Sequence, residues 1–129
     1  MIELSRNHYT LSTDPSRLDP NAIFGYLSRS YWANQRTKET VEKSLQHSLN
    51  FGLYCGDQQV GLARVITDYA TFAYLCDVYV LEEHQGHGLG KWLIDTVTSH
   101  PDLANIRMFL LATRDAHGLY QQYGFEELP

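Results

Sequence analysis

The sequence lacks the features that mark secreted and membrane-spanning proteins. Only two of its 129 residues are cysteines, and both stand in apolar stretches typical of strands. That setting favours free buried thiols at Cys55 and Cys76 over a disulfide. No apolar run approaches the length of a membrane-spanning helix, and the first residues lack the apolar region of a secretory signal peptide. We therefore expect a cytoplasmic protein that does not enter a membrane.

Basic residues are also scarce. Ten Lys and Arg stand against fifteen Asp and Glu, so the formal net charge is −5. Because binding to nucleic-acid phosphates needs a basic surface, we expect no nucleic-acid partner. Repeats and low-complexity segments are absent, and the balance of 43% hydrophobic and 19% charged residues is that of a folded protein. The length predicts one domain over residues 1–129.

Glycine is concentrated at one place, where Gly86, Gly88 and Gly90 alternate between an apolar stretch and the start of a predicted helix. Without Cβ atoms, this backbone lets a ligand approach closely. The first N–H groups of a helix are unpaired and carry the positive end of its dipole. The pattern therefore predicts a site for phosphate or pyrophosphate, although a glycine turn that only permits tight packing is the alternative.

Two familiar nucleotide loops do not fit this segment. A P-loop requires glycine where Gln85 stands and a hydroxyl residue where Trp92 stands. The Rossmann pattern G-x-G-x-x-G differs in spacing from the G-x-G-x-G found at 86–90. A nucleotide-dependent switch is therefore disfavoured.

The segment does match the pattern Q/R-x-x-G-x-G/A, with Gln85, Gly88 and Gly90 in the defining places. It resembles the acetyl-CoA pyrophosphate loop of the GNAT acetyltransferase superfamily. Downstream, residues 119–125 read Leu-Tyr-Gln-Gln-Tyr-Gly-Phe and resemble the L/F-Y-x-x-x-G-F motif of the same family. The resemblance covers residues 72–125 and is weak before them.

Periodicity predicts a mixed α/β domain with the order β-α-α-β-β-β-α-β-α-β. Helices are expected after the capping residues Asp19, Thr37 and Asp115, and from Leu89. Strands are expected at 8–13, 51–55, 60–67, 72–81 and 106–113, and after Gly124. The resemblance implies a single-domain GNAT-like fold, in which a mostly antiparallel sheet has a splayed pair of central parallel strands with acetyl-CoA between them.

The resemblance also implies a reaction. Acetyl-CoA would donate an acetyl group to a primary amine of a small molecule or a protein, by direct attack in a ternary complex. The family's acetyl-CoA contacts correspond to these positions: Val78, Tyr79, Val80, Gln85, Gly86, His87, Gly88, Leu89, Gly90 and Lys91. A non-catalytic acyl-CoA-binding module with the same fold is the alternative.

Two residues are candidates for proton transfer. The resemblance assigns the general acid to Tyr120, whose phenol is protonated at neutral pH and can protonate the leaving thiolate. Asp77 is the only charge in the central apolar strand. With a raised pKa its carboxylate would accept the proton of the amine; alternatively it forms a structural ion pair with Arg64 or Arg107.

The acceptor wall of the family lies between the first two helices, which corresponds here to Tyr31, Trp32 and Arg36, with Arg64 facing the same cleft from a strand. Such residues are typical of recognition sites, although loop aromatics often only pack. His84 and His87 have metal-ligand spacing but no further ligands beside them, so we expect no metal.

The end of the sequence departs from the family pattern. Only four residues follow Phe125, whereas most relatives continue for at least one more strand. An edge left without that strand would need another cover. We therefore expect either a more open acceptor site or a homodimer in which the second copy covers the edge.

Overall fold

The computed structural model describes residues 1–112 and 117–126. Its strands are β1 (Glu3–Arg6), β2 (Tyr9–Ser12), β3 (Leu49–Cys55), β4 (Gln58–Thr67), β5 (Phe72–Val80) and β6 (Met108–Leu111). Its α-helices are α1 (Pro20–Leu27), α2 (Lys38–Gln46), α3 (Leu89–Thr98) and α4 (His117–Gln121). Short 3₁₀ turns lie at Pro15–Arg17, Glu82–His84 and Pro101–Leu103.

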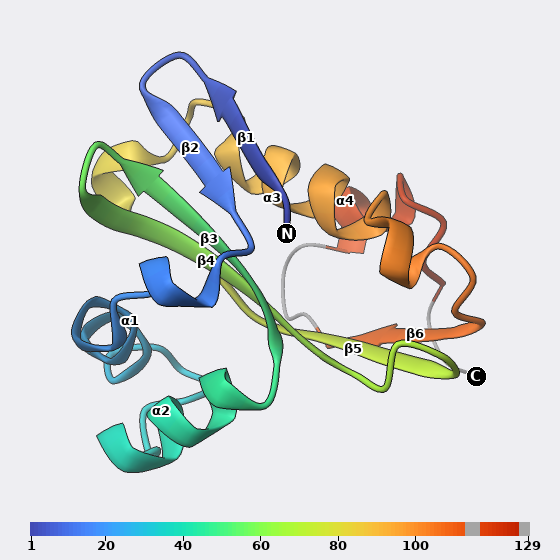
Figure 1. Ribbon diagram of the computed structural model, residues 1–129, viewed down its shortest axis with the longest axis horizontal. Helices are drawn as coiled ribbons and strands as arrows, with labels where there is room; N and C mark the ends of the chain where they lie inside the picture. Colours follow the sequence, from blue (N-terminus) through green and yellow to red (C-terminus); the bar gives the residue numbers. More distant parts are fainter. Residues whose placement is uncertain (113–116, 127–129) are drawn as a thin grey trace.

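The strands form one six-stranded sheet in chain order, β1-β2-β3-β4-β5-β6 (Figure 1). Every neighbouring pair is antiparallel except β5 and β6, which run parallel from Phe72 and Met108 to Leu75 and Leu111. Beyond Leu75, β5 continues to Val80 without β6 beside it. The predicted mixed sheet with a splayed parallel pair is therefore confirmed.

The start of the sheet differs from the prediction of a single first strand. β1 precedes it and forms a hairpin with β2 through a turn at Asn7, whose φ is +55°. All four residues of β1 are exposed. Because neither face of β1 is buried, its sequence has no apolar alternation that would have revealed a strand.

The helix boundaries follow the predicted capping residues. The Asp19 carboxylate accepts from the Ala22 N–H at 3.1 Å, and the Thr37 hydroxyl accepts from the Thr40 N–H at 3.1 Å. Gly124 follows α4 at φ +88°, the left-handed conformation that ends many helices. The predicted cap Asp115 lies outside the described residues. The sequence also predicts a strand after Gly124. Residues 124–126 are not in a strand, and residues 127–129 lie outside the described residues.

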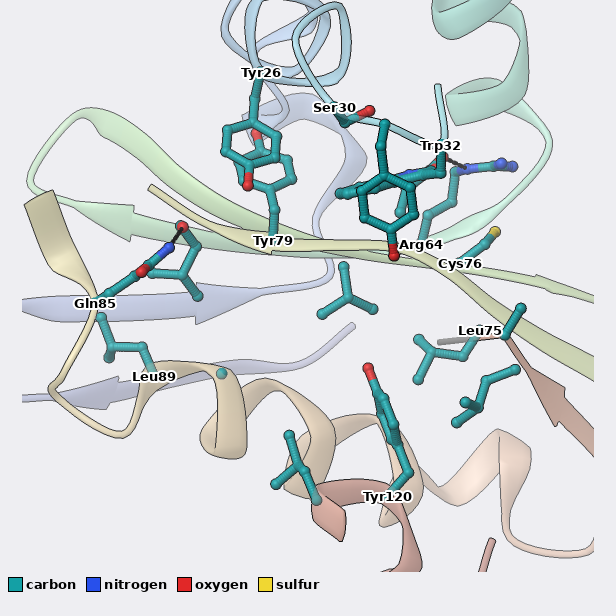
Figure 2. Close-up of a pocket in the computed structure, with 18 of the residues that line it drawn as sticks. Tyr26, Ser30, Trp32, Arg64, Leu75, Cys76, Tyr79, Gln85, Leu89 and Tyr120 are labelled. Carbon is teal, nitrogen blue, oxygen red and sulfur yellow. Dashed lines mark hydrogen bonds and ion pairs between the residues drawn. The ribbon is translucent and has the colours of Figure 1, made fainter. Parts of the chain in front are cut away.

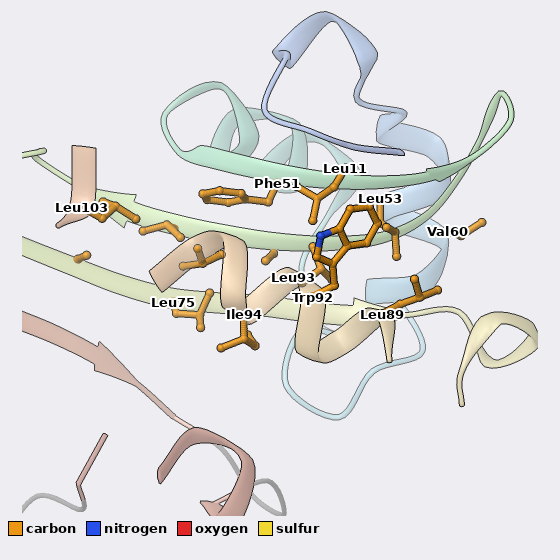
Figure 3. Close-up of a cluster of buried hydrophobic side chains, with 14 residues drawn as sticks. Leu11, Phe51, Leu53, Val60, Leu75, Leu89, Trp92, Leu93, Ile94 and Leu103 are labelled. Atoms are coloured by element: carbon orange, nitrogen blue, oxygen red, sulfur yellow. The ribbon is translucent and has the colours of Figure 1, made fainter. Parts of the chain in front are cut away.

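Helices α1 and α2 lie on one face of the sheet and α3 on the other (Figure 1). A hydrophobic cluster lies under the helices on each face. The larger lies under α3, where Leu89, Trp92 and Leu93 contact the sheet residues around Phe51 and Leu53 (Figure 3). The smaller lies under α1 and α2, around Ile23, Val41 and Leu62. The sheet is therefore a middle layer covered by helices on both faces.

A β-bulge in β5 changes which face its side chains reach. Opposite β4, Leu62 pairs with Tyr79 but Arg64 pairs with Cys76, so Asp77 and Val78 together oppose Ala63. Asp77 has a φ of +51°, which is rare for a residue with a side chain. Leu75 belongs to the cluster under α3, whereas Tyr79 belongs to the cluster under α1 and α2. In a regular strand, Leu75 and Tyr79 would lie on the same face. The extra residue of the bulge places them on opposite faces.

The two cysteines are free, as predicted, but half-buried instead of buried. None of the helices that the structure describes is long and apolar enough to cross a membrane. The homodimer remains a prediction, because a single chain does not test it.

Candidate active site

A cleft of about 1510 Å³ opens where β5 diverges from β6. Figure 2 shows Tyr120 pointing from α4 towards β5, with Tyr79, Trp32 and Arg64 on the other side of that strand. Gln85 and Leu89 lie at one end of the cleft and Leu75 at the other (Figure 2). The cleft is therefore bounded by β5, the start of α3, α4 and the segment between α1 and α2.

Most of the predicted site residues line this one cleft. They are Tyr31, Trp32, Arg36, Arg64, Asp77, Val78, Tyr79, Val80, Gln85, Gly86, Gly88, Leu89, Gly90 and Tyr120. His87 and Lys91 are not among the lining residues. Positions up to 89 residues apart in the sequence thus meet around a single space, from Tyr31 to Tyr120.

The glycine-rich segment has the geometry of a phosphate cradle. Gly86 and Gly88 have φ of +86° and +74°, which a side chain would strain. A Cβ built on Gly86, Gly88 or Gly90 would meet no atom within 4 Å, so the space above all three is open. Gly88 is the N-cap of α3 and supplies no side-chain cap. The first N–H groups of α3 are therefore available to a ligand.

Gln85 ties the segment that precedes the glycines to the end of β5. Its side-chain amide donates to the backbone carbonyl of Val80 at 2.9 Å. The bond joins the end of β5 to the loop that follows it. Gln85 thus has a structural role that its place in the motif did not reveal.

The histidines of this region lie against β2 instead of in the cleft. His84 Nδ1 lies 2.9 Å from the Tyr9 hydroxyl, and the His87 ring lies 6.4 Å from the Tyr9 ring. Within residues 1–112 and 117–126 there is no group of three or more His, Cys, Asp or Glu that would hold a metal ion. The absence of a metal stays a prediction for the whole chain.

Three donors hold the carboxylate of Asp77. The indole N–H of Trp32 donates to Oδ1 at 2.8 Å. Arg64 Nε and Arg36 Nη1 both donate to Oδ2, at 2.7 and 2.8 Å. Asp77 is 3% exposed, so its carboxylate is buried, and its three bonds join the segment between α1 and α2 to the bulge of β5.

This network argues against the first of the two roles predicted for Asp77, which requires a raised pKa. Burial alone would raise the pKa, but the hydrogen bonds and charges of Arg36 and Arg64 outweigh it and lower the pKa below its usual value. An ionised carboxylate with both oxygens engaged is a weak proton acceptor. The contacts favour the structural ion pair with Arg64 over the general base, and Arg107 has no part in it.

Tyr120 is placed to reach the middle of the cleft. Its ring packs on Phe125 with centroids 6.0 Å apart and lies next to the larger hydrophobic cluster. Burial, and to a smaller extent the neighbouring phenol of Tyr31, raises the pKa of Tyr120 above its ordinary value. The phenol therefore carries its proton at neutral pH, as a general acid must.

Several cleft residues had no recognisable signal in the sequence. The Tyr26 ring stacks on Tyr79 at 4.0 Å and 8°, and Arg29 makes two bonds to Glu82, of 2.6 and 2.9 Å, across 53 residues of sequence. Both contacts pair distant segments, so local patterns do not predict them. Cys76 also lines the cleft, and burial raises the pKa of its thiol to about 11, which keeps it protonated.

Comparisons with known proteins agree with this architecture. The family described as "Acetyltransferase (GNAT) domain" matches residues 46–127. "Putative acetyltransferase FG08082" of Gibberella zeae is 35% identical, over 95% of this chain and 82% of that protein. A crystal structure from Xanthomonas campestris, described as a putative acetyltransferase belonging to the GNAT family, is 51% identical with a TM-score of 0.91, over 94% of this chain and 86% of the other.

A more distant structure shows the same fold. It is a GNAT family acetyltransferase from Elizabethkingia anophelis with acetyl-CoA bound, 16% identical, with a TM-score of 0.69 over 96% of this chain and 80% of the other. The family match covers most of the chain and both predicted motifs. The chain therefore belongs to the GNAT acetyltransferase family.

Proposed function

We propose that this protein transfers an acetyl group from acetyl-CoA to a primary amine, by direct attack while both substrates occupy the cleft. The observation that carries the proposal is the open space above Gly86, Gly88 and Gly90, which continues into the same cleft as Val78 and Tyr120. A ligand with a diphosphate at one end and a thioester at the other fits that arrangement. The acetyl-CoA bound to the Elizabethkingia relative supports the choice of donor.

The backbone of β5 would hold the pantetheine arm and the thioester. β6 leaves β5 after Leu75, so the following residues of β5 have backbone groups that are not paired to it. The bulge at Asp77 and Val78 also leaves an extra residue outside the β4 ladder. An N–H group at this point would donate to the thioester oxygen and stabilise the negative charge that develops there during attack.

In the proposed reaction, Tyr120 is the side chain that transfers a proton. The amine nitrogen forms a bond to the acetyl carbon, the C–S bond breaks, and the sulfur takes the proton of Tyr120. The cleft carboxylates Asp77 and Glu82 are both ion-paired, so we assign the amine proton to solvent, from which Tyr120 is reprotonated.

Filling the phosphate space tests the donor site. Gly90 has an ordinary helical φ and open space beyond it, so Gly90→Val should fold while its side chain occupies the ligand's place. Calorimetry should then show acetyl-CoA affinity reduced by at least tenfold. Gly88 is less suitable, because its φ of +74° would strain any side chain.

Gly25→Val is the matched control, since Gly25 in α1 is also helical with nothing within 4 Å and does not line the cleft. It should bind acetyl-CoA as the wild type does. Unchanged affinity in a folded Gly90→Val variant would contradict the assignment. Turnover of acetyl-CoA with a panel of amines separates the enzyme from a non-catalytic acyl-CoA-binding module.

A further inference from the structure

The charges that line the cleft do not balance. Among the described lining residues there are three arginines, Arg29, Arg36 and Arg64, and two carboxylates, Asp77 and Glu82. Arg29 and Glu82 neutralise each other through two hydrogen bonds. Arg36 and Arg64 therefore share the single carboxylate of Asp77, which leaves one positive charge in excess on this wall, although the whole chain carries −5.

Arg36 is the guanidinium with donors to spare. Arg64 is buried, and it uses Nε on Asp77 and Nη1 on the Ser48 hydroxyl. The Arg36 side chain is 28% exposed and, among the described residues, donates only through Nη1 to Asp77. A guanidinium has five N–H donors in a planar fork. Most of the Arg36 donors are therefore available to a group that enters the cleft.

Asp77 cannot offset this charge further. Its second oxygen accepts from Trp32, so the carboxylate is held in place from both sides. No lining carboxylate among the described residues is free to receive an ammonium group, because Glu82 is bound to Arg29. A cationic ligand would meet a like charge here, whereas a carboxylate would meet a partly buried guanidinium, the stronger kind of hydrogen-bonded pair.

We infer that the acetyl acceptor is a small amine that also carries a carboxylate, as a free amino acid does, and that Arg36 binds this carboxylate. The inference rests on the proposed function and names the acceptor class for it. The edge-to-face pair of Tyr31 and Trp32, 54% and 36% exposed with centroids 5.2 Å apart, adds an apolar surface next to Arg36. This surface suits an amino acid with an apolar or aromatic side chain.

Matched acceptors test the inference. Acetyl transfer is measured for the apolar and aromatic amino acids and for their carboxamides, with each kcat/KM corrected for the fraction of neutral amine. At least one amino acid should be used 10-fold or more better than its amide, the scale of a lost hydrogen bond to a charged group. Equal use of acids and amides would overturn the inference and leave the acetyltransferase itself in place.

Arg36 variants assign the effect to this side chain. Arg36→Gln should remove the preference for the acid without changing the affinity for acetyl-CoA, and Arg36→Lys should restore part of it. Arg17→Gln is the control, since Arg17 is paired with Glu3 and does not line the cleft, and it should retain the preference. A preference that persists in a folded Arg36→Gln variant would contradict the assignment.

A binding measurement separates this inference from the proposed reaction. N-acetyl amino acids and their amides are titrated calorimetrically into the protein saturated with CoA. Tighter binding of the acids without turnover of any amine would support the carboxylate site and overturn the acetyltransferase. Equal binding, or no binding of either set, would overturn the carboxylate site.

Discussion

Asp77 shows how one buried charge connects two parts of the cleft. Trp32 and Arg36 come from the segment between α1 and α2, and Arg64 comes from β4, yet all three donate to the same carboxylate. The carboxylate thereby fixes the segment between α1 and α2 relative to the bulge of β5. Its contribution is to position other groups, because its low pKa makes it a poor proton acceptor.

Replacing Asp77 by asparagine should be costly at neutral pH. Asp77→Asn leaves two guanidinium groups without their counter-charge, and breaking such a buried pair costs about 3–5 kcal/mol in the free energy of unfolding. Because the folded pKa is lowered, the stabilisation is complete above the unfolded value of about 3.9 and is lost as the pH falls through the folded pKa. Urea titrations should show a gap between wild type and variant that narrows below about pH 3.9. A gap that stays constant under acid would contradict the ion pair.

Tyr120 is predicted to act in turnover and not in binding. Tyr120→Phe keeps the ring that packs on Phe125 and removes only the hydroxyl. The affinity for acetyl-CoA should be unchanged, while kcat falls by about 10²-fold or more, the scale of a lost general acid. Tyr123→Phe is the control, because the Tyr123 hydroxyl bonds to Asp95 and does not line the cleft. Equal kcat in Tyr120→Phe and wild type would mean that solvent protonates the thiolate.

Among the strands, β5 departs most from regular pairing. It pairs with β4 along its length, with β6 over its first half only, and carries the bulge that moves Asp77 and Tyr79 to the face of α1 and α2. Neighbouring strands must leave room for this backbone. Gly61 in β4 does so, since a Cβ there would lie 2.8 Å from the Tyr79 carbonyl oxygen and 3.1 Å from a methyl group of Leu53.

Gly61→Ala should therefore disturb β5 directly. The added methyl group meets backbone, which cannot rotate away, so we expect a loss of about 1–3 kcal/mol in unfolding free energy. Acetyl-CoA affinity should fall as well, because the displaced segment would hold the pantetheine arm. Gly25→Ala, in open space within α1, should instead stabilise the protein by about 0.5–1 kcal/mol. Wild-type stability and affinity in Gly61→Ala would show that β4 and β5 tolerate the methyl group.

For the whole molecule, the cleft lies between elements that come from distant parts of the chain. β5, α3 and α4 each contribute to its lining, together with the segment after α1. A ligand that contacts all of them binds only the folded chain. Acetyl-CoA at 100 times its Kd should add about 2.7 kcal/mol of stability and raise Tm by roughly 10 °C.

ATP provides the comparison for this thermal shift. It offers phosphates to the glycine loop but has no pantetheine arm or thioester for β5. We expect it to leave Tm nearly unchanged at the same concentration. A shift equal to that of acetyl-CoA would mean that the loop binds nucleotides in general, which the positions of Gln85 and Trp92 argue against.

Signals between neighbouring residues predict the helices and the glycine-rich turn before α3. Capping at Asp19 and Thr37, the apolar period of α3 and the glycine spacing at 86–90 all act between residues close in the chain. Such signals can be recognised without knowing the fold. The motif around Tyr120 is local too, since Gly124 takes its left-handed conformation a few residues after α4.

The partners of the buried charge at Asp77 depend on contacts between distant segments of the chain. No local pattern predicts the bulge at Asp77. Aspartate rarely adopts a φ of +51°, and it does so here because Trp32, Arg36 and Arg64 hold its carboxylate. These donors lie 13 to 45 residues away in the sequence. The sequence left two roles open for Asp77. Burial raises the pKa of its carboxyl group, but the guanidinium groups of Arg36 and Arg64 outweigh burial and lower the pKa, which favours the structural role. The excess charge of Arg36 likewise depends on tertiary contacts, because it follows from the pairing of Asp77 and Glu82, the carboxylates among the described lining residues.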